Sequence, residues 1–427
     1  MFLVIIYYMM PPKGRKRCRS LLPDVLSNLL DNVVDVILMY LPCKDAVRTS
    51  ILSTKWRYNW CRRTKLTLDE SHWRTKNDRL DHTVKFKKII NQFLALHEGP
   101  ITKFTLKINS LKRCPKIDNF ICFLSRNEIR YLVLHLPREK PYKLPSSLFT
   151  CSQLSHLTLH DCSINPSSAF KGFDKLISLE LCRVTISSEF LESLISHCLL
   201  LEQFVLEIPE VVNRIEINAS KLRSFDFTGC VSSIYLKNVP LLEKVSLIGD
   251  ESSMEAENFG FAKSCSALEH LIFNYSYNEM ALDEQDEVAT RLPFEVNSIK
   301  RFYLPHLRAL CLIRSFPHLE YLEIEVGNEY DITALECLEM ERFSDVTFNH
   351  LREVKIKCFT GTTPEIQLIK LLFAKSPLLL RMLIDTWFLD HKFLDTRLDT
   401  LAEISKFWRA SPKAEVVYID CSLKMRS

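Results

Sequence analysis

Leu154-Ser155-His156-Leu157-Thr158-Leu159 and, further along, Leu176-Ile177-Ser178-Leu179-Glu180-Leu181 follow one pattern, with apolar residues at the first, fourth and sixth positions. The pattern recurs through the middle of this 427-residue chain. Its eight occurrences are Ile101-Phe104-Leu106, Ile129-Leu132-Leu134, Leu154-Leu157-Leu159, Leu176-Leu179-Leu181, Leu201-Phe204-Leu206, Leu222-Phe225-Phe227, Leu242-Val245-Leu247 and Leu268-Leu271-Phe273. Successive first positions are separated by 28, 25, 22, 25, 21, 20 and 26 residues.

This period and spacing are the sequence signature of leucine-rich repeats. Alternate residues of a short strand point to the same face, so the fourth and sixth positions of each unit face inward together. One unit cannot bury its own apolar face, and units therefore stack on their neighbours. The pattern predicts an α/β solenoid of irregular leucine-rich repeats, with a parallel inner sheet and outer helices.

Helical and extended segments fit between and after these repeats. The expected outer helices are residues 84–96, 117–124 and 190–198, and residues 278–287 read as an acidic surface loop. Beyond the loop we expect a strand at 299–303, a helix at 305–315 and a further unit at Leu319-Leu322-Ile324. A helix at 365–374, with Ile366, Ile369, Leu372 and Phe373 inward, and a strand at 379–384 follow.

A compact helical module precedes the repeats. Val33, Ile37 and Leu41 recur at helical spacing, and Val34 and Leu38 widen them to one broad apolar face before Pro42 ends the helix. A second short helix should bury Ala46, Val47, Ser50 and Ile51, and a third turn places Trp56 and Trp60 on one face. Three helices this short cannot bury their apolar faces among themselves, so the module should dock on the chain or on a partner.

The stretches Leu26–Val33 and Tyr40–Trp60 resemble an F-box, most closely that of plant proteins which combine an F-box, leucine-rich repeats and a C-terminal FBD region. The chain reads Leu29-Leu30-Asp31 where that family usually has Leu-Pro-Asp, and Cys43 where it often has Thr. The resemblance implies binding to a Skp-type adaptor and, through it, to a cullin ubiquitin-ligase core. Its apolar contacts would come from Leu29, Val33, Ile37, Leu41, Pro42, Val47 and Leu52.

The end of the chain, at residues 351–361 and 409–418, is similar to the FBD region of the same family. We therefore expect four parts. These are an unstructured apolar and basic extension at 1–20, an F-box at 21–63, a leucine-rich-repeat solenoid at 64–345, and an FBD-like region at 346–427 that closes the solenoid.

Composition and motifs point away from several other classes of protein. A net charge of +4 does not require a nucleic-acid partner, and the apolar run at residues 2–10 is too short to span a bilayer. The 15 cysteines lack CxxC and zinc-site spacing, which indicates reduced thiols in a nuclear or cytoplasmic protein. No catalytic or phosphate-binding motif occurs, and we expect no cofactor and no metal site.

The hypothesis is a non-catalytic subunit of a ubiquitin ligase that acts in the ubiquitin-conjugation pathway, with its repeats holding an unknown target protein. Target contacts would come from non-inward strand positions, namely His156, Thr158, Ser178, Glu180, Ser224 and Asp226. Alternatives stay open: a repeat-based interaction scaffold with a degenerate F-box, a protein that binds nucleic acid through its basic N-terminal stretch, and a small-molecule receptor. An enzyme is disfavoured.

Overall fold

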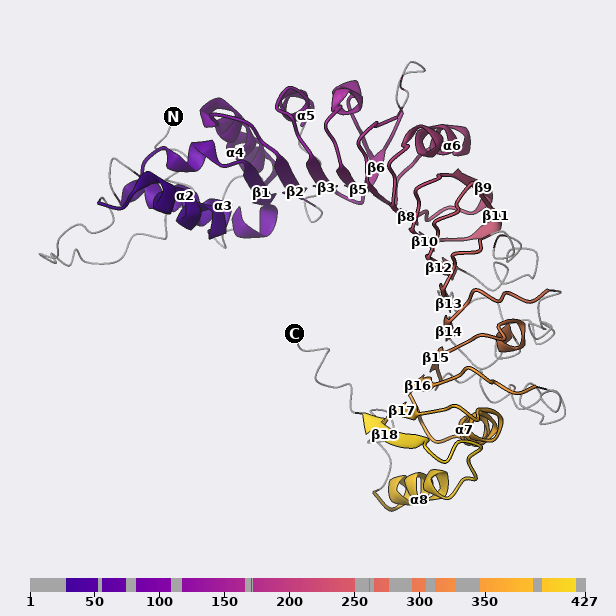
Figure 1. The fold of residues 1–427 in the computed structure, drawn as a ribbon. Coiled ribbons are helices and arrows are strands. Elements are labelled where there is room, and N and C mark those ends of the chain that lie inside the picture. The colour runs from indigo at the N-terminus through magenta and orange to yellow at the C-terminus, as the bar shows by residue number, and fades with distance from the viewer. Residues whose placement is uncertain are drawn as a thin grey trace, which may run out of the picture. The chain divides into compact units, whose positions relative to one another are not determined.

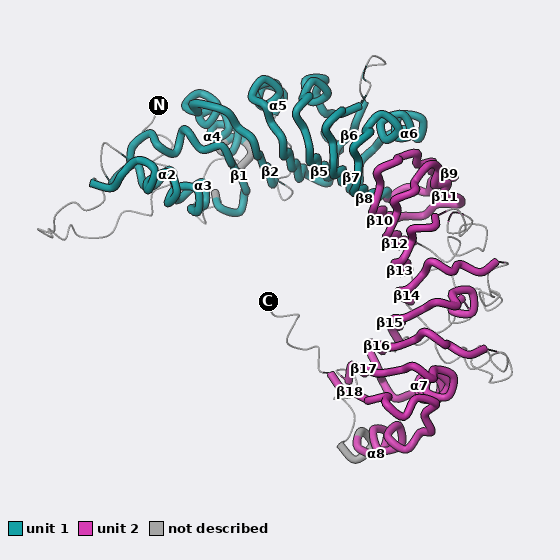
Figure 2. Tube along the Cα trace, viewed as in Figure 1, with its two compact units in different colours: residues 1–208 teal, residues 209–427 magenta. Residues whose placement is uncertain are grey.

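The computed structural model describes residues 28–52, 56–73, 82–108, 117–165, 170, 172–249, 261, 265–275, 294–304, 312–326, 346–386 and 394–419. The predictions for residues 1–20, for the acidic loop 278–287 and for most of the helix at 305–315 lie outside these ranges. The chain divides into two compact units, residues 1–208 and residues 209–427 (Figure 2). No helix in the described part is both long and apolar enough to cross a membrane.

The N-terminal module consists of short helices, as predicted. They are α2 (Asp31–Tyr40), α3 (Cys43–Arg48), and the 3-10 turns η1 (Thr49–Ile51) and η2 (Asn59–Arg62). Leu30 precedes α2 and Pro42 precedes α3. Each has an extended backbone ψ, so the helix begins at the residue that follows it. The interior of the module is formed by Val34, Leu38, Cys43, Ala46, Val47, Trp56, Trp60 and Cys61, all of them buried.

The broad apolar face predicted for α2 is divided in the structure. Val34 and Leu38 are buried, whereas Val33 is 39% exposed and Ile37 only partly covered. The prediction that Ile51 is buried was wrong, because its side chain is 58% exposed. The helices of the module are too short to cover both sides of α2 and η1, so one set of apolar side chains stays outside.

The module is anchored to the first repeat. Trp60 packs edge to face on Phe93 of α4 (His82–Leu96), with ring centroids 5.1 Å apart. The amide of Glu98 donates to the carbonyl of Cys61 at 2.8 Å. The Arg63 guanidinium donates to the carbonyl of Leu41 at 2.9 Å, which satisfies an oxygen just beyond the end of α2.

The first unit contains a parallel sheet with helices on one side (Figure 1). Its strands, in their hydrogen-bonded order, are β1 (Lys65–Asp69), β2 (Lys103–Lys107), β3 (Tyr131–His135), β5 (His156–His160), β7 (Ser178–Cys182) and β8 (Gln203–Glu207). The helices are α4, α5 (Asp118–Ser125) and α6 (Ser188–His197), with the turns η3 (Glu70–Trp73) and η4 (Ser146–Thr150). The short strands β4 (Tyr142–Lys143) and β6 (Cys162–Ser163) pair separately.

The second unit repeats this arrangement. Its strands, in order, are β10 (Ser224–Thr228), β12 (Lys244–Gly249), β13 (His270–Tyr275), β14 (Arg301–Leu304), β15 (Tyr321–Glu325), β16 (Glu353–Lys357), β17 (Arg381–Asp385) and β18 (Glu415–Ile419). Near its end lie α7 (Thr363–Lys375) and α8 (Leu394–Ser405). Leu368, Ile369, Leu372 and Phe373 of α7 are buried, while Ile366 is only partly covered.

The register of the strands confirms the repeat prediction. In the first unit the fourth positions form one ladder, in which Phe104, Leu132, Leu157, Leu179 and Phe204 are hydrogen-bond register partners in turn. All five side chains are buried. The apolar side chains therefore stack repeat on repeat, and the fold class is the leucine-rich-repeat solenoid that the spacing predicted.

Two repeats have a short strand rather than a helix after their strand of the main sheet. β9 (Val212–Asn218) pairs in parallel with β11 (Val231–Lys237) in a separate two-stranded sheet. These repeats have the shortest spacings in the chain, 21 and 20 residues, which leave little room for a helix and its two turns. The alternating apolar positions Ile215, Ile217, Ile234 and Leu236 also favour strands.

The start of α2 offers a test of the residue that departs from the F-box pattern. Leu30 has φ −63° and ψ 148°, and proline prefers the same φ. We expect Leu30→Pro to restrict the unfolded chain without straining the folded one, which stabilises the helix start by about 0.4–1 kcal/mol. Amide exchange along α2, followed by mass spectrometry, should slow by about two- to fivefold.

The matched control is Leu30→Ala, which removes the same exposed side chain without restricting φ. Exchange in Leu30→Pro that is as fast as in Leu30→Ala would show that the proline strains the segment before it instead.

Candidate functional site

The sheet face opposite the helices carries the polar side chains of each strand. In the first unit the predicted target-binding residues are brought together on two adjacent strands. His156 is in register with Ser178, and Thr158 with Glu180, whose carboxylate accepts a hydrogen bond from the Thr158 hydroxyl at 3.2 Å. All four side chains are partly exposed. These four residues therefore form one continuous surface, although their role in binding a target stays a prediction.

The other two predicted residues, Ser224 and Asp226, lie on β10 of the second unit. Asp226 is in register with Ser246, and its carboxylate forms an ion pair with Lys244 at 3.1 Å. Its carboxylate is thus already compensated within its own sheet.

A row of titratable groups crosses the end of the sheet in the first unit. His135, His160, Cys182 and Glu207 are register partners on β3, β5, β7 and β8. The rings of His135 and His160 stack with centroids 4.0 Å apart and an interplanar angle of 15°. Burial, followed by the neighbouring His160, lowers the pKa of His135. The stacking fixes the plane of the His160 ring.

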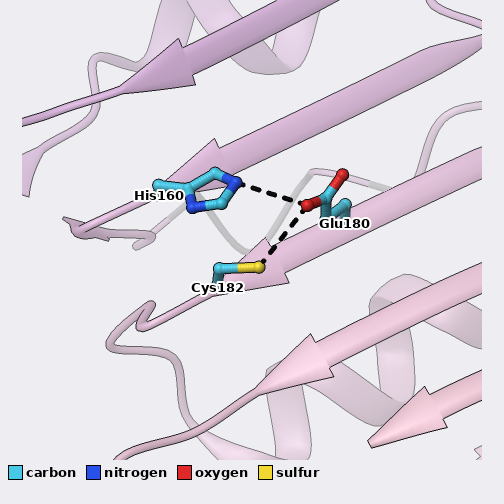
Figure 3. Close-up of side chains that lie close together, drawn as sticks. All are labelled: His160, Glu180 and Cys182. Atoms are coloured by element: carbon cyan, nitrogen blue, oxygen red, sulfur yellow. Dashed lines mark hydrogen bonds and ion pairs between the residues drawn. The ribbon is translucent and has the colours of Figure 1, made fainter. Parts of the chain in front are cut away.

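Glu180 lies between His160 and Cys182, as Figure 3 shows. Its Oε1 is 3.3 Å from Nε2 of His160, and it accepts a hydrogen bond from the Cys182 thiol at 3.6 Å. The interaction with His160, opposed by burial and supported by the Thr158 and Cys182 hydrogen bonds, lowers the pKa of Glu180. Burial, together with the nearby Glu180 and Glu207, raises the pKa of Cys182 to about 12. A carboxylate, an imidazole and a protonated thiol therefore meet at one point.

Arg183 holds the turn after β7 in place. Its Nε and Nη2 donate to the two carboxylate oxygens of Asp161 at 2.8 and 2.9 Å, and its Nη1 donates to Glu207 at 2.8 Å. Asp161 is buried, and both Asp161 and Arg183 have positive φ, 58° and 52°. Hydrogen bonding to Asp161 raises the pKa of Arg183, so the guanidinium stays charged. This bidentate pair links two successive repeats at equivalent positions.

The sequence contained a signal for this cluster. His160 and Cys182 are 22 residues apart, the same interval as between Leu154 and Leu176, so they occupy one position of successive repeats. Aligning the sequence on the repeat period, rather than searching for close CxxC-type spacing, places His160 beside Cys182 and leaves Glu180 two residues away on the same face.

A second candidate surface lies on the F-box module. Large apolar side chains remain exposed at and next to α2 and from the end of η1 to the start of η2: Leu30, Val33, Val36, Met39, Tyr40, Ile51, Leu52 and Tyr58. Of the residues predicted to bind a Skp-type adaptor, Val33, Pro42 and Leu52 are exposed, and Leu29, Ile37 and Leu41 are partly covered. Val47 is fully buried inside the module, where it packs the helices rather than offering surface. A module with this much exposed apolar surface is suited to bind another protein.

Five cysteines of the described ranges are poorly suited to covalent catalysis. Burial raises the pKa of Cys43, Cys61, Cys151 and Cys358 to about 12, as it does for Cys182. A thiolate is the reactive form of cysteine, and these thiols stay protonated at neutral pH.

The fold and these surfaces define the class: a leucine-rich-repeat protein with a helical F-box module at its N-terminal end. The repeats match the family model described as FBD-associated F-box protein At5g56370, LRR repeats, over residues 117–324. The F-box/FBD/LRR-repeat protein At1g13570 of Arabidopsis thaliana is 32% identical over 419 residues, which cover 93% of this chain and 99% of that protein. The chain therefore belongs to the F-box/FBD/LRR-repeat family.

Two further relatives from Arabidopsis thaliana cover less of the chain. The F-box/FBD/LRR-repeat protein At1g78750 is 27% identical over 315 residues, which cover 71% of this chain and 65% of that protein. The F-box/LRR-repeat protein At4g14103 is 31% identical over 193 residues, which cover 43% of this chain and 49% of that protein.

The Arg183 clamp should contribute measurably to the stability of the first unit. Arg183→Met leaves the buried Asp161 carboxylate without its bidentate partner, and we expect a loss of about 3 kcal/mol in the free energy of unfolding. Arg183→Lys keeps the charge but not the fork geometry and should lose less. Chemical unfolding followed by circular dichroism measures both.

Arg138 provides the control, because it contacts the same Asp161 oxygen at 3.9 Å from an exposed position. Arg138→Met should change stability by less than about 0.5 kcal/mol. Equal losses in the Arg138 and Arg183 variants would contradict the assignment of the clamp to Arg183.

Proposed function

We propose that this protein is the substrate-recognition adaptor of a Skp–cullin–F-box ubiquitin ligase. On this proposal the F-box module binds a Skp-type adaptor, and the repeats hold a target protein. The observation that carries the proposal is the division of the module into a buried interior and an exposed apolar face, in a chain that belongs to an F-box family.

The exposed face of the module supports adaptor binding on physical grounds. Tyr40 is 86% exposed and Leu52 46% exposed, although removing apolar surface from water is favourable by about 25 cal/mol per Å². The Trp60–Phe93 contact already anchors the opposite side of the module to the first repeat. A partner could therefore bind the exposed apolar face without unpacking the module from the solenoid.

The adaptor would act without catalysis of its own. Its part in the reaction is proximity, because holding the target near a charged conjugating enzyme raises the effective concentration of the target's lysines. The raised pKa values of the buried thiols are consistent with this role. A protonated thiol is a poor nucleophile, and an adaptor that acts by proximity needs no covalent ubiquitin intermediate on these cysteines.

The target would lie on the sheet face, at His156, Thr158, Ser178 and Glu180 in the first unit and at Ser224 and Asp226 in the second. A location in the nucleus or cytoplasm is part of the same proposal. It rests on the cysteines of the described ranges, which are thiols and mostly buried, as expected in a reducing compartment.

The test is co-expression with a Skp-type adaptor and a pull-down from purified components. We expect the wild-type chain to retain the adaptor and the double variant Val33→Asp/Leu52→Asp to lose it by at least about tenfold, because two charges would be buried at the interface. Both side chains are exposed in the free protein, so the variant should fold. Val47 is unsuitable for this test, because a charge at a fully buried position would unfold the module.

Leu199→Asp is the matched control, since Leu199 is equally apolar and 68% exposed but lies just beyond the C-terminal end of α6, away from the module. It should bind the adaptor like the wild type. A folded wild-type chain that does not retain the adaptor would favour the alternative, an interaction scaffold with a degenerate F-box.

A further inference from the structure

We propose that His160, Glu180 and Cys182 form a binding site for zinc, or for a chemically similar divalent ion, on the sheet face of the first unit (Figure 3). The three residues come from adjacent strands, β5 and β7, and their ligand atoms lie within 4.8 Å of one another. Nitrogen, oxygen and sulfur ligands in one cluster are the donor set that zinc takes in proteins.

The distances fit a shared metal ion. In a tetrahedral zinc site with bonds of about 2.0–2.3 Å, neighbouring ligand atoms lie about 3.3–3.7 Å apart. The Glu180 Oε1 to His160 Nε2 distance is 3.3 Å, and the Cys182 Sγ to Glu180 Oε1 distance is 3.6 Å. Two edges of the tetrahedron are therefore already formed, and the third, between Sγ of Cys182 and Nε2 of His160, is no longer than 4.8 Å.

The hydrogen bonding of His160 points the same way. Its Nε2 is buried, and the polar atom that faces it among the described residues is Oε1 of Glu180 at 3.3 Å, a contact that is not aligned as a regular hydrogen bond. A neutral imidazole with its lone pair on Nε2 gains nothing from a facing carboxylate oxygen, whereas a cation held between the two atoms would be bound by both. The stacked ring of His135 keeps His160 in the orientation that this requires.

The charges around the cluster favour a dication. Among the residues that the structure describes, no lysine or arginine forms an ion pair with Glu180. Arg183 is paired with Asp161 and Glu207, and although its charge and that of Lys107 act on the neighbouring His135, neither cation forms an ion pair with Glu180 in the described part of the chain. Glu207 is also the register partner of Cys182 and adds negative charge beside the thiol.

Binding balances in charge and protons. The metal forms a bond to Sγ of Cys182 while the thiol proton leaves to solvent, and Nε2 of His160 contributes its lone pair with the ring proton on Nδ1. One thiolate and one carboxylate neutralise the two charges of the ion. Three protein ligands leave a fourth coordination position for water or for a side chain of a bound protein.

The test uses the full-length reduced protein, stripped of metal by a chelator and titrated with Co²⁺. We expect one equivalent to bind with a thiolate-to-cobalt charge-transfer band, which added Zn²⁺ abolishes by displacement. Cys182→Ser should remove the band, and His160→Gln should weaken binding by at least about tenfold, since even residues that only support metal ligands cost about 10–100-fold when replaced.

Cys358 provides a matched control, because it also donates from its thiol to a carboxylate, Glu325, at 3.7 Å, but it is not part of this cluster. Cys358→Ser should keep the band and the affinity of the wild type. Circular dichroism checks that each variant is folded, and if Cys182→Ser does not fold, the His160→Gln titration decides.

Absence of the charge-transfer band in the wild type would overturn the proposal, as would its persistence in folded Cys182→Ser or unchanged affinity in folded His160→Gln. The cluster would then be a hydrogen-bonded group that strengthens the sheet and binds no metal.

Discussion

The constraint on which the structure depends is the parallel register between successive repeats. The side chains of one strand alternate between two faces, so the register that buries Leu157 against Leu132 and Leu179 also fixes the neighbours of every polar residue on the other face. A shift of one residue would expose the leucines and bury His156, Thr158 and His160. Burial on one side therefore determines the chemistry on the other, and the Thr158–Glu180 hydrogen bond and the His160–Cys182 neighbourhood follow from the leucine pattern.

The F-box module meets the opposite problem, because it is too small to bury its own apolar residues. The module divides its apolar residues between an interior face, which includes one side of α2 and the turn η2, and an exposed face on the other side of α2. Trp60 packs on Phe93 and joins the module to the solenoid, while Val33 and its exposed neighbours remain outside. An isolated module of this length would be marginally stable. Attachment to the first repeat completes the interior of the module. Its outer apolar side chains therefore do not have to be buried for the module to be stable, and they remain accessible to another protein.

Much of this architecture was predictable because it depends on periodicity. The strands of the eight repeats, the outer helices α4, α5 and α6, and the helix α7 all follow from apolar spacing in the sequence. The sequence was less informative where tertiary context decides. The spacing of Ile51 is that of a buried helical residue, but α3 ends at Arg48 and, among the described elements, none covers the Ile51 side chain, which is 58% exposed. β9 and β11 replace helices because their repeats are short, a limit that shows only when the intervals are compared.

The cluster at His160 shows why a search of local motifs overlooks sites in repeat proteins. Zinc motifs in compact domains bring ligands together over a few residues, whereas a solenoid brings together residues one full repeat apart, and that interval differs from unit to unit. The same geometry would constrain any target that binds the sheet face of the first unit. Several polar groups on this face and at its edge are already bonded to one another, as in the Thr158–Glu180 hydrogen bond and the Arg183 clamp on Asp161 and Glu207. A target that bound here would gain little from pairing with these groups, because it would have to break bonds that the surface already makes. It would gain instead from matching a surface whose side chains are held in place before binding, and such preorganisation lowers the entropic cost of association.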